Sequence, residues 1–120
     1  MTSRRVTSSS VPYLPVTVEI PEQRLSAEFT ALVDTGFNAD AVVPESSIDG
    51  SVISLLQTDV RLADGSRITL PAYLGNVRIG TTTVGPVLLL AMGDEAIVGL
   101  NVITRFRLMI DHDQQLTIEP

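Results

Sequence analysis

An aspartate followed by threonine and glycine, Asp34-Thr35-Gly36, is the segment of this sequence best suited to chemistry. It comes directly after the apolar segment Ala31-Leu32-Val33, so its carboxyl group would leave an apolar strand at a glycine turn. A carboxylate held in this way can accept a proton from water, and its protonated form can donate one. A given tripeptide arises by chance in roughly a few per cent of chains of this length, so this segment needs support from elsewhere in the chain.

A second segment, Ala96-Ile97-Val98-Gly99-Leu100-Asn101, places two β-branched residues directly before a glycine. β-Branched residues favour strands, and alone this segment would be ordinary core in most β proteins. It follows the aspartate in the chain, with a predicted hairpin between the two. The ordered combination is therefore much more specific than either part.

Two strands are predicted to deliver the chain to Asp34. Apolar and polar residues alternate over Tyr13–Ile20 and over Leu25–Val33, which is the period of a half-buried strand. Pro21–Arg24 would form the turn of this hairpin. After the polar loop that follows Gly36, Ala41–Val43 predicts a short strand that ends at Pro44.

The remainder of the chain predicts further strands with at most two short helices, so the expected fold class is all-β. Glu45–Leu56 is ambiguous, although Ile53–Gln57 fits a helical turn, and Asn101 is a suitable N-cap for a helix over Val102–Arg105. The expected strand pairs are a hairpin over Asp59–Leu70 that turns at Ala63-Asp64-Gly65-Ser66, the pair Ala72–Ile79 and Thr82–Ala91, and a final hairpin of Phe106–Ile110 and Gln115–Glu119.

The composition favours one globular domain without nucleic-acid or membrane partners. The 120 residues are 44% hydrophobic, and we expect a flexible polar tail over residues 1–10 followed by a single domain over residues 11–120. A net charge of −6 and scattered arginines argue against binding to nucleic acid. The chain has no cysteine, its longest apolar run is too short to span a bilayer, and its first residues do not resemble a secretory signal, so we expect a cytoplasmic protein.

The order of these motifs resembles the retropepsin-like aspartic peptidases, in particular their small bacterial and retrotransposon-type members. The resemblance is carried by Ala31–Pro44, Val60–Ile79 and Ile97–Glu119, and in all it covers about residues 11–119. It implies a closed acid-protease β-barrel that assembles as a homodimer. It also implies an aspartic endopeptidase that acts on peptides or proteins in an extended conformation.

The chemistry of that family uses two aspartates that share one proton. One acts as base on a water molecule, while the other polarises the carbonyl of the scissile bond. This sequence has one such motif, so the resemblance implies that Asp34 from each of two chains meets at a two-fold axis. No metal or cofactor is required.

The resemblance assigns roles to further residues. Thr35 would form hydrogen bonds across the dimer axis, and Gly36 would let backbone approach the aspartates closely. The predicted substrate contacts are Phe37, Asn38 and Asp40 beyond the catalytic loop, and Ala63, Asp64, Gly65 and Ser66 in a flap that closes over the peptide. Ile97, Val98 and Gly99 would pack behind Asp34, and the final hairpin would join the N-terminal strand in a dimer sheet.

Three departures from the viral pattern keep a second interpretation open. Phe37 stands where the retroviral enzymes have alanine, Leu100 stands where they have arginine, and the flap turn is short and polar. The alternative is a catalytically inactive module of the same fold that dimerises or binds peptides. A small β-barrel binding module unrelated to peptidases is a further alternative. The single histidine, His112, is expected in a solvated turn rather than in a metal site.

Overall fold

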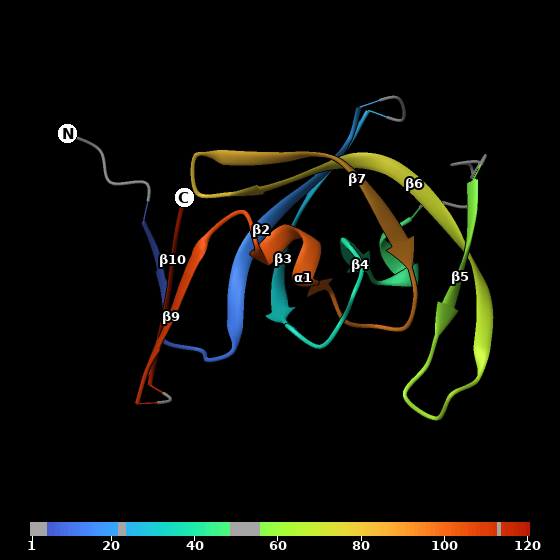
Figure 1. Cartoon of the computed structure of the whole chain (residues 1–120). Helices are drawn as coiled ribbons and strands as arrows, with labels where there is room; N and C mark the ends of the chain where they lie inside the picture. Colours follow the sequence, from blue (N-terminus) through green and yellow to red (C-terminus); the bar gives the residue numbers. More distant parts are fainter. Residues whose placement is uncertain (1–4, 22–23, 49–55, 113) are drawn as a thin grey trace.

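The computed structural model describes residues 5–21, 24–48, 56–112 and 114–120, which form two β-sheets (Figure 1). The larger sheet has the strand order β2-β3-β8-β4-β7-β6-β5, and the smaller one has the order β1-β10-β9. The all-β expectation with one or two short helices is confirmed. The elements are β1 (Val6–Ser8), β2 (Tyr13–Ile20), β3 (Leu25–Val33), β4 (Ala41–Val43), a 3-10 turn (Glu45–Ser47), β5 (Leu56–Arg61), β6 (Arg67–Ile79), β7 (Thr82–Ala91), β8 (Ile97–Val98), α1 (Leu100–Ile103), β9 (Arg107–Asp111) and β10 (Gln115–Glu119).

The hairpin of β2 and β3 forms over the predicted residues. Tyr13 pairs with Leu32 and Ile20 with Leu25, in an unbroken antiparallel register. Alternate residues of β2 face the interior, because side chains of a strand point to opposite faces in turn. Leu14, Val16, Val18 and Ile20 are all buried. β3 then carries the chain out of the core at Asp34.

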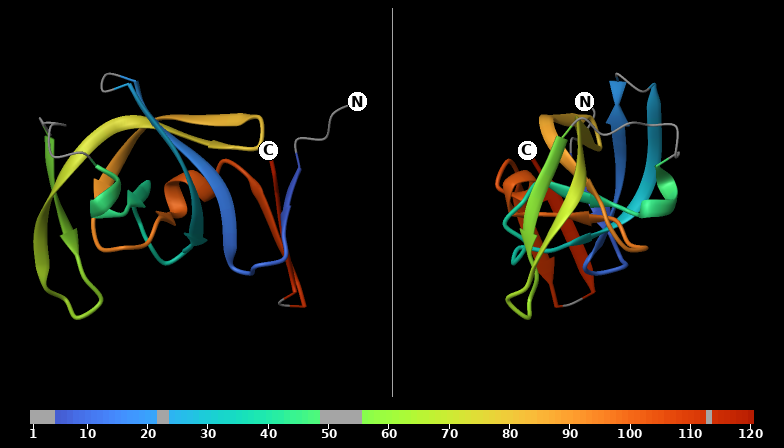
Figure 2. Two further views of the ribbon diagram at one scale, coloured as in Figure 1. Left: turned by 180° about the vertical axis from the view of Figure 1, so that it is seen from behind. Right: turned by 90° about the vertical axis from the view of Figure 1, so that its right-hand side faces the viewer.

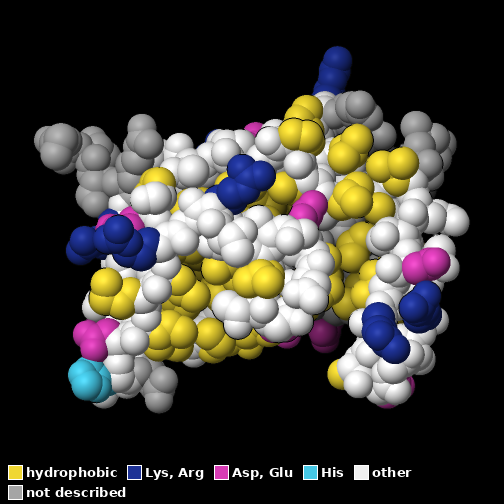
Figure 3. Space-filling view, in the orientation of Figure 1, with side chains coloured by type: hydrophobic (Ala, Val, Ile, Leu, Met, Phe, Trp, Pro, Cys, Tyr) yellow, Lys and Arg dark blue, Asp and Glu magenta, His cyan; other side chains and the backbone are white. Residues whose placement is uncertain are grey.

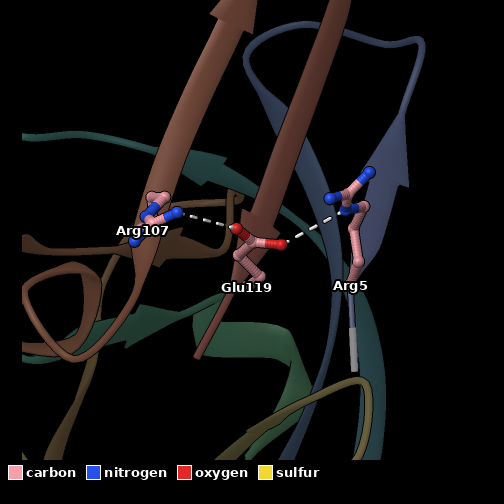
Figure 4. Close-up of polar contacts among 3 residues, drawn as sticks. All are labelled: Arg5, Arg107 and Glu119. Atoms are coloured by element: carbon pink, nitrogen blue, oxygen red, sulfur yellow. Dashed lines mark hydrogen bonds and ion pairs between the residues drawn. The ribbon is translucent and has the colours of Figure 1, made fainter. Parts of the chain in front are cut away.

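The small sheet joins the two ends of the described chain. Val6–Ser8, within the range expected to be a flexible tail, forms β1 and pairs with β10. Leu116 and Ile118 of β10 are fully buried and belong to the main core. On the opposite face of this sheet, the Glu119 carboxylate pairs with Arg5 at 3.2 Å and with Arg107 at 3.4 Å (Figure 4). One acidic side chain thus links β10 to β9 and to the residue just before β1.

β6 is longer than the sequence predicted. The expected break near Pro71 is absent, and β6 runs unbroken from Arg67 to Ile79, with Pro71 opposite Gln57 of β5. The apolar alternation on the two sides of Pro71 is in phase, so Leu70 and Ala72 lie on the same face and the strand continues. The expected helical turn over Ile53–Gln57 falls partly outside the described residues, and its last two residues, Leu56 and Gln57, begin β5.

The hairpin of β5 and β6 extends away from the body of the molecule (Figures 1 and 2). Its turn, the loop between β3 and β4, and the turn between β9 and β10 all lie toward the lower side in these views. Among the described residues, no helix is long and apolar enough to cross a membrane.

Candidate active site

Asp34 lies where β3 leaves the sheet beside β8. The two strands are parallel, with Leu32 opposite Ile97 and Val33 opposite Val98. The Asp34 backbone N–H donates to the Val98 carbonyl at 3.0 Å, which extends this pairing by one residue. The position of the aspartate backbone therefore depends directly on β8.

The turn after Asp34 holds one oxygen of its carboxylate. The Gly36 N–H donates to Asp34 Oδ1 at 2.9 Å, and the Phe37 N–H donates to the Asp34 carbonyl at 3.2 Å. A Cβ at position 36 would lie 3.3 Å from Asp34 Oδ1, which is a tight contact. Glycine thus lets the backbone N–H reach the carboxylate without crowding. Thr35, between the two, is exposed.

Gly99 lies directly under the loop that follows Asp34. Its N–H donates to the Asp40 carbonyl at 2.8 Å, and the Leu100 N–H donates to the Phe37 carbonyl at 2.8 Å. A Cβ on Gly99 would lie 2.3 Å from the Ala39 carbonyl oxygen and 2.9 Å from the Phe37 ring. Since φ of Gly99 is −93°, glycine is needed here for space and not for an unusual backbone conformation.

Asp40 connects this loop to two other elements. One carboxylate oxygen accepts the Leu88 backbone N–H at 2.7 Å, and the other accepts the Asn101 side-chain amide at 3.0 Å. The sequence indicated Asn101 as an N-cap, but α1 begins at Leu100 and its N-cap is Gly99 without a side-chain cap bond. Asn101 instead braces Asp40, because the helix starts earlier than predicted and its side chain faces the loop.

A cleft of about 770 Å³ contains Asp34 and lies between the loop after β3 and the hairpin of β5 and β6. It brings together most of the predicted contacts, whereas Asp64, Gly65 and Ser66 form the hairpin turn outside its lining, and Val98 and Gly99 are buried beneath it. The predicted residues in its lining are Asp34, Gly36, Phe37, Asn38, Asp40, Ala63 and Ile97.

Other lining residues of the cleft were missed by the sequence analysis. They include the consecutive residues 58–62 at the end of β5, and also Leu88 and Leu90 of β7 and Met92 just beyond it. The alternate spacing of Leu88, Leu90 and Met92 was the available signal, but only the register of β5, β6 and β7 shows that these strands line the cleft together. Phe37, Val60 and Ile97 pack against a small buried cluster of Val42, Ala72 and Leu90. The floor of the cleft is therefore apolar.

The flap turn, which we define as Leu62–Ser66, is held by its own polar groups. The Leu62 N–H donates to the Ser66 carbonyl at 2.8 Å, and Gly65 has a positive φ of 88°. The Ser66 hydroxyl and backbone N–H both donate to Asp64 Oδ1. These hydrogen bonds favour the charged form, so they hold the pKa of Asp64 below its usual range.

Other parts of the described chain lack comparable chemistry. A second cavity, of about 500 Å³, lies beside β1, β2 and β3 and contains none of the predicted site residues. His112 lies in an exposed turn next to Asp111. Within the described ranges, no three acidic or histidine side chains lie close enough together to hold a metal ion.

Solved structures of the retropepsin-like fold are similar to this chain. The crystal structure of a retropepsin-like aspartic protease from Rickettsia conorii matches with a TM-score of 0.64 at 16% identity, covering 95% of this chain and 89% of that one. The foamy viral protease-reverse transcriptase in complex with an RNA/DNA hybrid matches with a TM-score of 0.56 at 16% identity, covering 80% of this chain and 12% of that one. No family model and no curated protein matches the sequence. These likenesses confirm the predicted retropepsin-like fold, at the level of its β architecture.

Proposed function

We propose that this retropepsin-like chain is an aspartic endopeptidase whose active site is completed by a second copy of itself. Asp34 from each copy would face the other across a two-fold axis and share one proton. The observation that carries the proposal is the strand-end carboxylate in a cleft with an apolar floor, with one of its oxygens fixed by the Gly36 N–H. The retropepsin-like fold of the two solved structures supports it.

The other carboxylates of the cleft are poor candidates for the second catalytic group. Asp40 uses both oxygens to accept hydrogen bonds from Leu88 and Asn101. Asp59 accepts the Thr69 hydroxyl at 2.7 Å from the strand opposite. Because these groups serve the scaffold, and the mechanism needs a pair of carboxylates, a second Asp34 is the better partner. This argument supports a homodimer.

The dimer would place the reacting groups as follows. One Asp34, ionised, takes a proton from a water molecule between the two carboxylates as that water attacks the peptide carbonyl carbon. The other, protonated, donates a hydrogen bond to the carbonyl oxygen on which negative charge develops. Collapse of the tetrahedral intermediate breaks the C–N bond, and the amine leaves with a proton from the pair.

The flap hairpin and the apolar floor would hold the peptide. An extended peptide can pair with strand backbone, and its alternate side chains then enter pockets. Phe37, Val60 and Ile97 in the lining of the cleft offer apolar contacts. Asn38 and Ala63 add polar and backbone contacts at the edges of the cleft. Closure of the flap would exclude water from the scissile bond.

The small sheet offers the surface for dimerisation. β9 is the last strand in the sheet order, and its Met109 and Ile110 side chains are 54% and 47% exposed. Large apolar side chains on an edge strand favour pairing with another chain. Thr35, exposed in the loop after β3, would meet its symmetry mate across the axis.

The proposal is tested by replacing Asp34 with asparagine, which keeps the shape of the side chain but removes the ionisable group. We expect cleavage of a peptide library by the Asp34→Asn variant to fall by at least about a thousandfold, because no base remains. Pepstatin-type inhibition of the wild-type protein is the second readout, since the inhibitor hydroxyl mimics the attacking water. Cleavage by the variant at the wild-type rate would exclude the proposed mechanism. Peptide binding without cleavage by the wild-type protein would favour the inactive binding module.

A further inference from the structure

An apolar surface continues from the cleft along the same face of the sheet. Leu88 and Leu90 are two residues apart on β7, so both face the cleft that contains Asp34. Leu88 is directly opposite Leu74 of β6, and the register of β5 puts Leu56 on this face as well. Leu56, Leu74 and Leu88 are 40%, 50% and 37% exposed. We call these three side chains the outer apolar patch.

The three leucines of the outer apolar patch lie next to one another and are not scattered over the surface. Of the five large hydrophobic side chains exposed in the described residues, these three lie on adjacent strands, and the other two, Met109 and Ile110, belong to β9. Figure 3 shows hydrophobic side chains gathered over β6 and β7, between the body of the molecule and the far end of the β5–β6 hairpin. A contiguous patch that adjoins a cleft is typical of a binding surface.

The position of the patch favours a peptide over a second copy of the chain. The loop after β3, the flap turn and the β9–β10 turn lie together on the lower side, where the proposed two-fold axis would pass (Figures 1 and 2). Leu56 is the first residue of β5, at the end of the β5–β6 hairpin that is remote from the flap turn, and a rise of ~3.3 Å per residue puts it about 20 Å from that turn. A partner subunit at the axis would therefore leave the patch open. A peptide that leaves the cleft along β7 would pass over it.

Resting on the proposed function, we propose that the outer apolar patch is a subsite for a large apolar side chain of the substrate, remote from the scissile bond. The Leu88 N–H bond to Asp40 fixes β7 at this point, so the subsite is preformed. The two-fold axis would create one such subsite at each end of the peptide. The substrate class is then a long extended peptide with large apolar residues at outer positions on both sides of the cleaved bond.

The test uses a set of long fluorescent peptides that share one apolar central pair and differ by leucine or serine at each outer position. Binding is measured to the Asp34→Asn protein, and cleavage is measured with the wild-type protein. We expect one outer position on each side of the cleaved bond at which leucine, compared with serine, improves affinity and kcat/KM by about tenfold. A gain of this size is typical when binding partly buries one apolar side chain. In Leu74→Ser this leucine-to-serine ratio should fall to about one. Thr83→Ala, an exposed position on β7 near the β6–β7 turn, is the control and should keep the ratio.

The outcomes separate this inference from the proposed function. If peptides are cleaved but no outer position discriminates leucine from serine, or Leu74→Ser keeps the ratio, the outer subsite is wrong and the peptidase stands. If outer leucine improves binding in a Leu74-dependent way while the wild-type protein cleaves nothing, the subsite stands and the peptidase mechanism is wrong. An effect on one side of the peptide only would contradict the two-fold arrangement.

Discussion

Asp40 and Asn101 are 61 positions apart in the sequence, and the side-chain amide of Asn101 donates a 3.0 Å hydrogen bond to Asp40 Oδ1. The second carboxylate oxygen accepts the Leu88 N–H at 2.7 Å. One side chain in the loop after Asp34 thus fixes both α1 and β7 relative to that loop. The rigidity of the candidate site depends on this bridge as well as on strand pairing.

The first prediction concerns the stability of this bridge. Asn101→Ala removes one of the two hydrogen bonds to the Asp40 carboxylate, and we expect the free energy of unfolding in urea to fall by about 1 kcal/mol. Asn38→Ala is the matched control, because no side-chain hydrogen bond forms at Asn38 within the described residues. The control should change stability by less than about 0.5 kcal/mol. Equal losses in the two variants would contradict the prediction.

The second prediction compares Gly99, where glycine is needed for space, with Gly65, where it is needed for a positive φ. In Gly99→Ala the new Cβ would meet the Ala39 carbonyl and the Phe37 ring, so we expect a loss of about 3 kcal/mol in unfolding free energy. Gly65→Ala has open space around it but keeps a φ of 88°, and should cost about 1 kcal/mol. Thermal unfolding of both variants makes the comparison. If the Gly99→Ala protein were as stable as the Gly65→Ala protein, the prediction would be wrong, because the loop after Asp34 could then shift to accommodate the new Cβ at little cost.

The third prediction concerns the flap turn in acid. Hydrogen bonds from Ser66 lower the folded-state pKa of Asp64. The ionised Asp64 carboxylate therefore stabilises the folded state at pH values above the ordinary carboxyl pKa of the unfolded chain. This stabilisation is lost as the pH falls through the lowered folded-state value. Carboxyl NMR titration should therefore give Asp64 a midpoint below its ordinary value, and Ser66→Ala should raise that midpoint. A midpoint at or above the ordinary value in the wild-type protein would refute the described turn.

The fourth prediction tests whether two copies share one active site. The Asp34→Asn protein should pair with wild-type chains and inactivate them. At a fixed wild-type concentration, an equal amount of the variant should lower activity to about half, because random pairing leaves half of the original wild-type dimers. Activity is followed after the mixture has exchanged subunits. If the rate stays unchanged while mixed dimers are detected by mass, each chain works alone.

Local patterns predicted the parts of the fold whose signal lies within a few residues. The β2–β3 hairpin formed over the predicted residues because its apolar alternation is unbroken, and β7 also has its predicted bounds. Asp34 and Gly99 were identified because each lies at the end of an apolar strand. These positions could be predicted without knowledge of contacts between residues far apart in the sequence.

Features that depend on distant contacts were missed. Asn101 fits an N-cap by its residue type, and only its approach to Asp40 reveals the bridge. The β7 side of the cleft depends on a register across three strands. β1 pairs with a strand at the opposite end of the chain, so nothing near Val6–Ser8 indicates it. The partner of Thr35 would lie on another molecule, beyond the reach of any pattern in one sequence.

The complete burial of Leu116 and Ile118 makes the main core depend on β10. Both side chains pack with buried residues of β2, β3 and β7, so a chain without β10 would leave their places in the core empty. β9 and β1 would then have no partner in the small sheet, because both pair with β10. A variant that shortens β10 should therefore disturb the scaffold that holds Asp34, although β10 contributes no residue to the cleft.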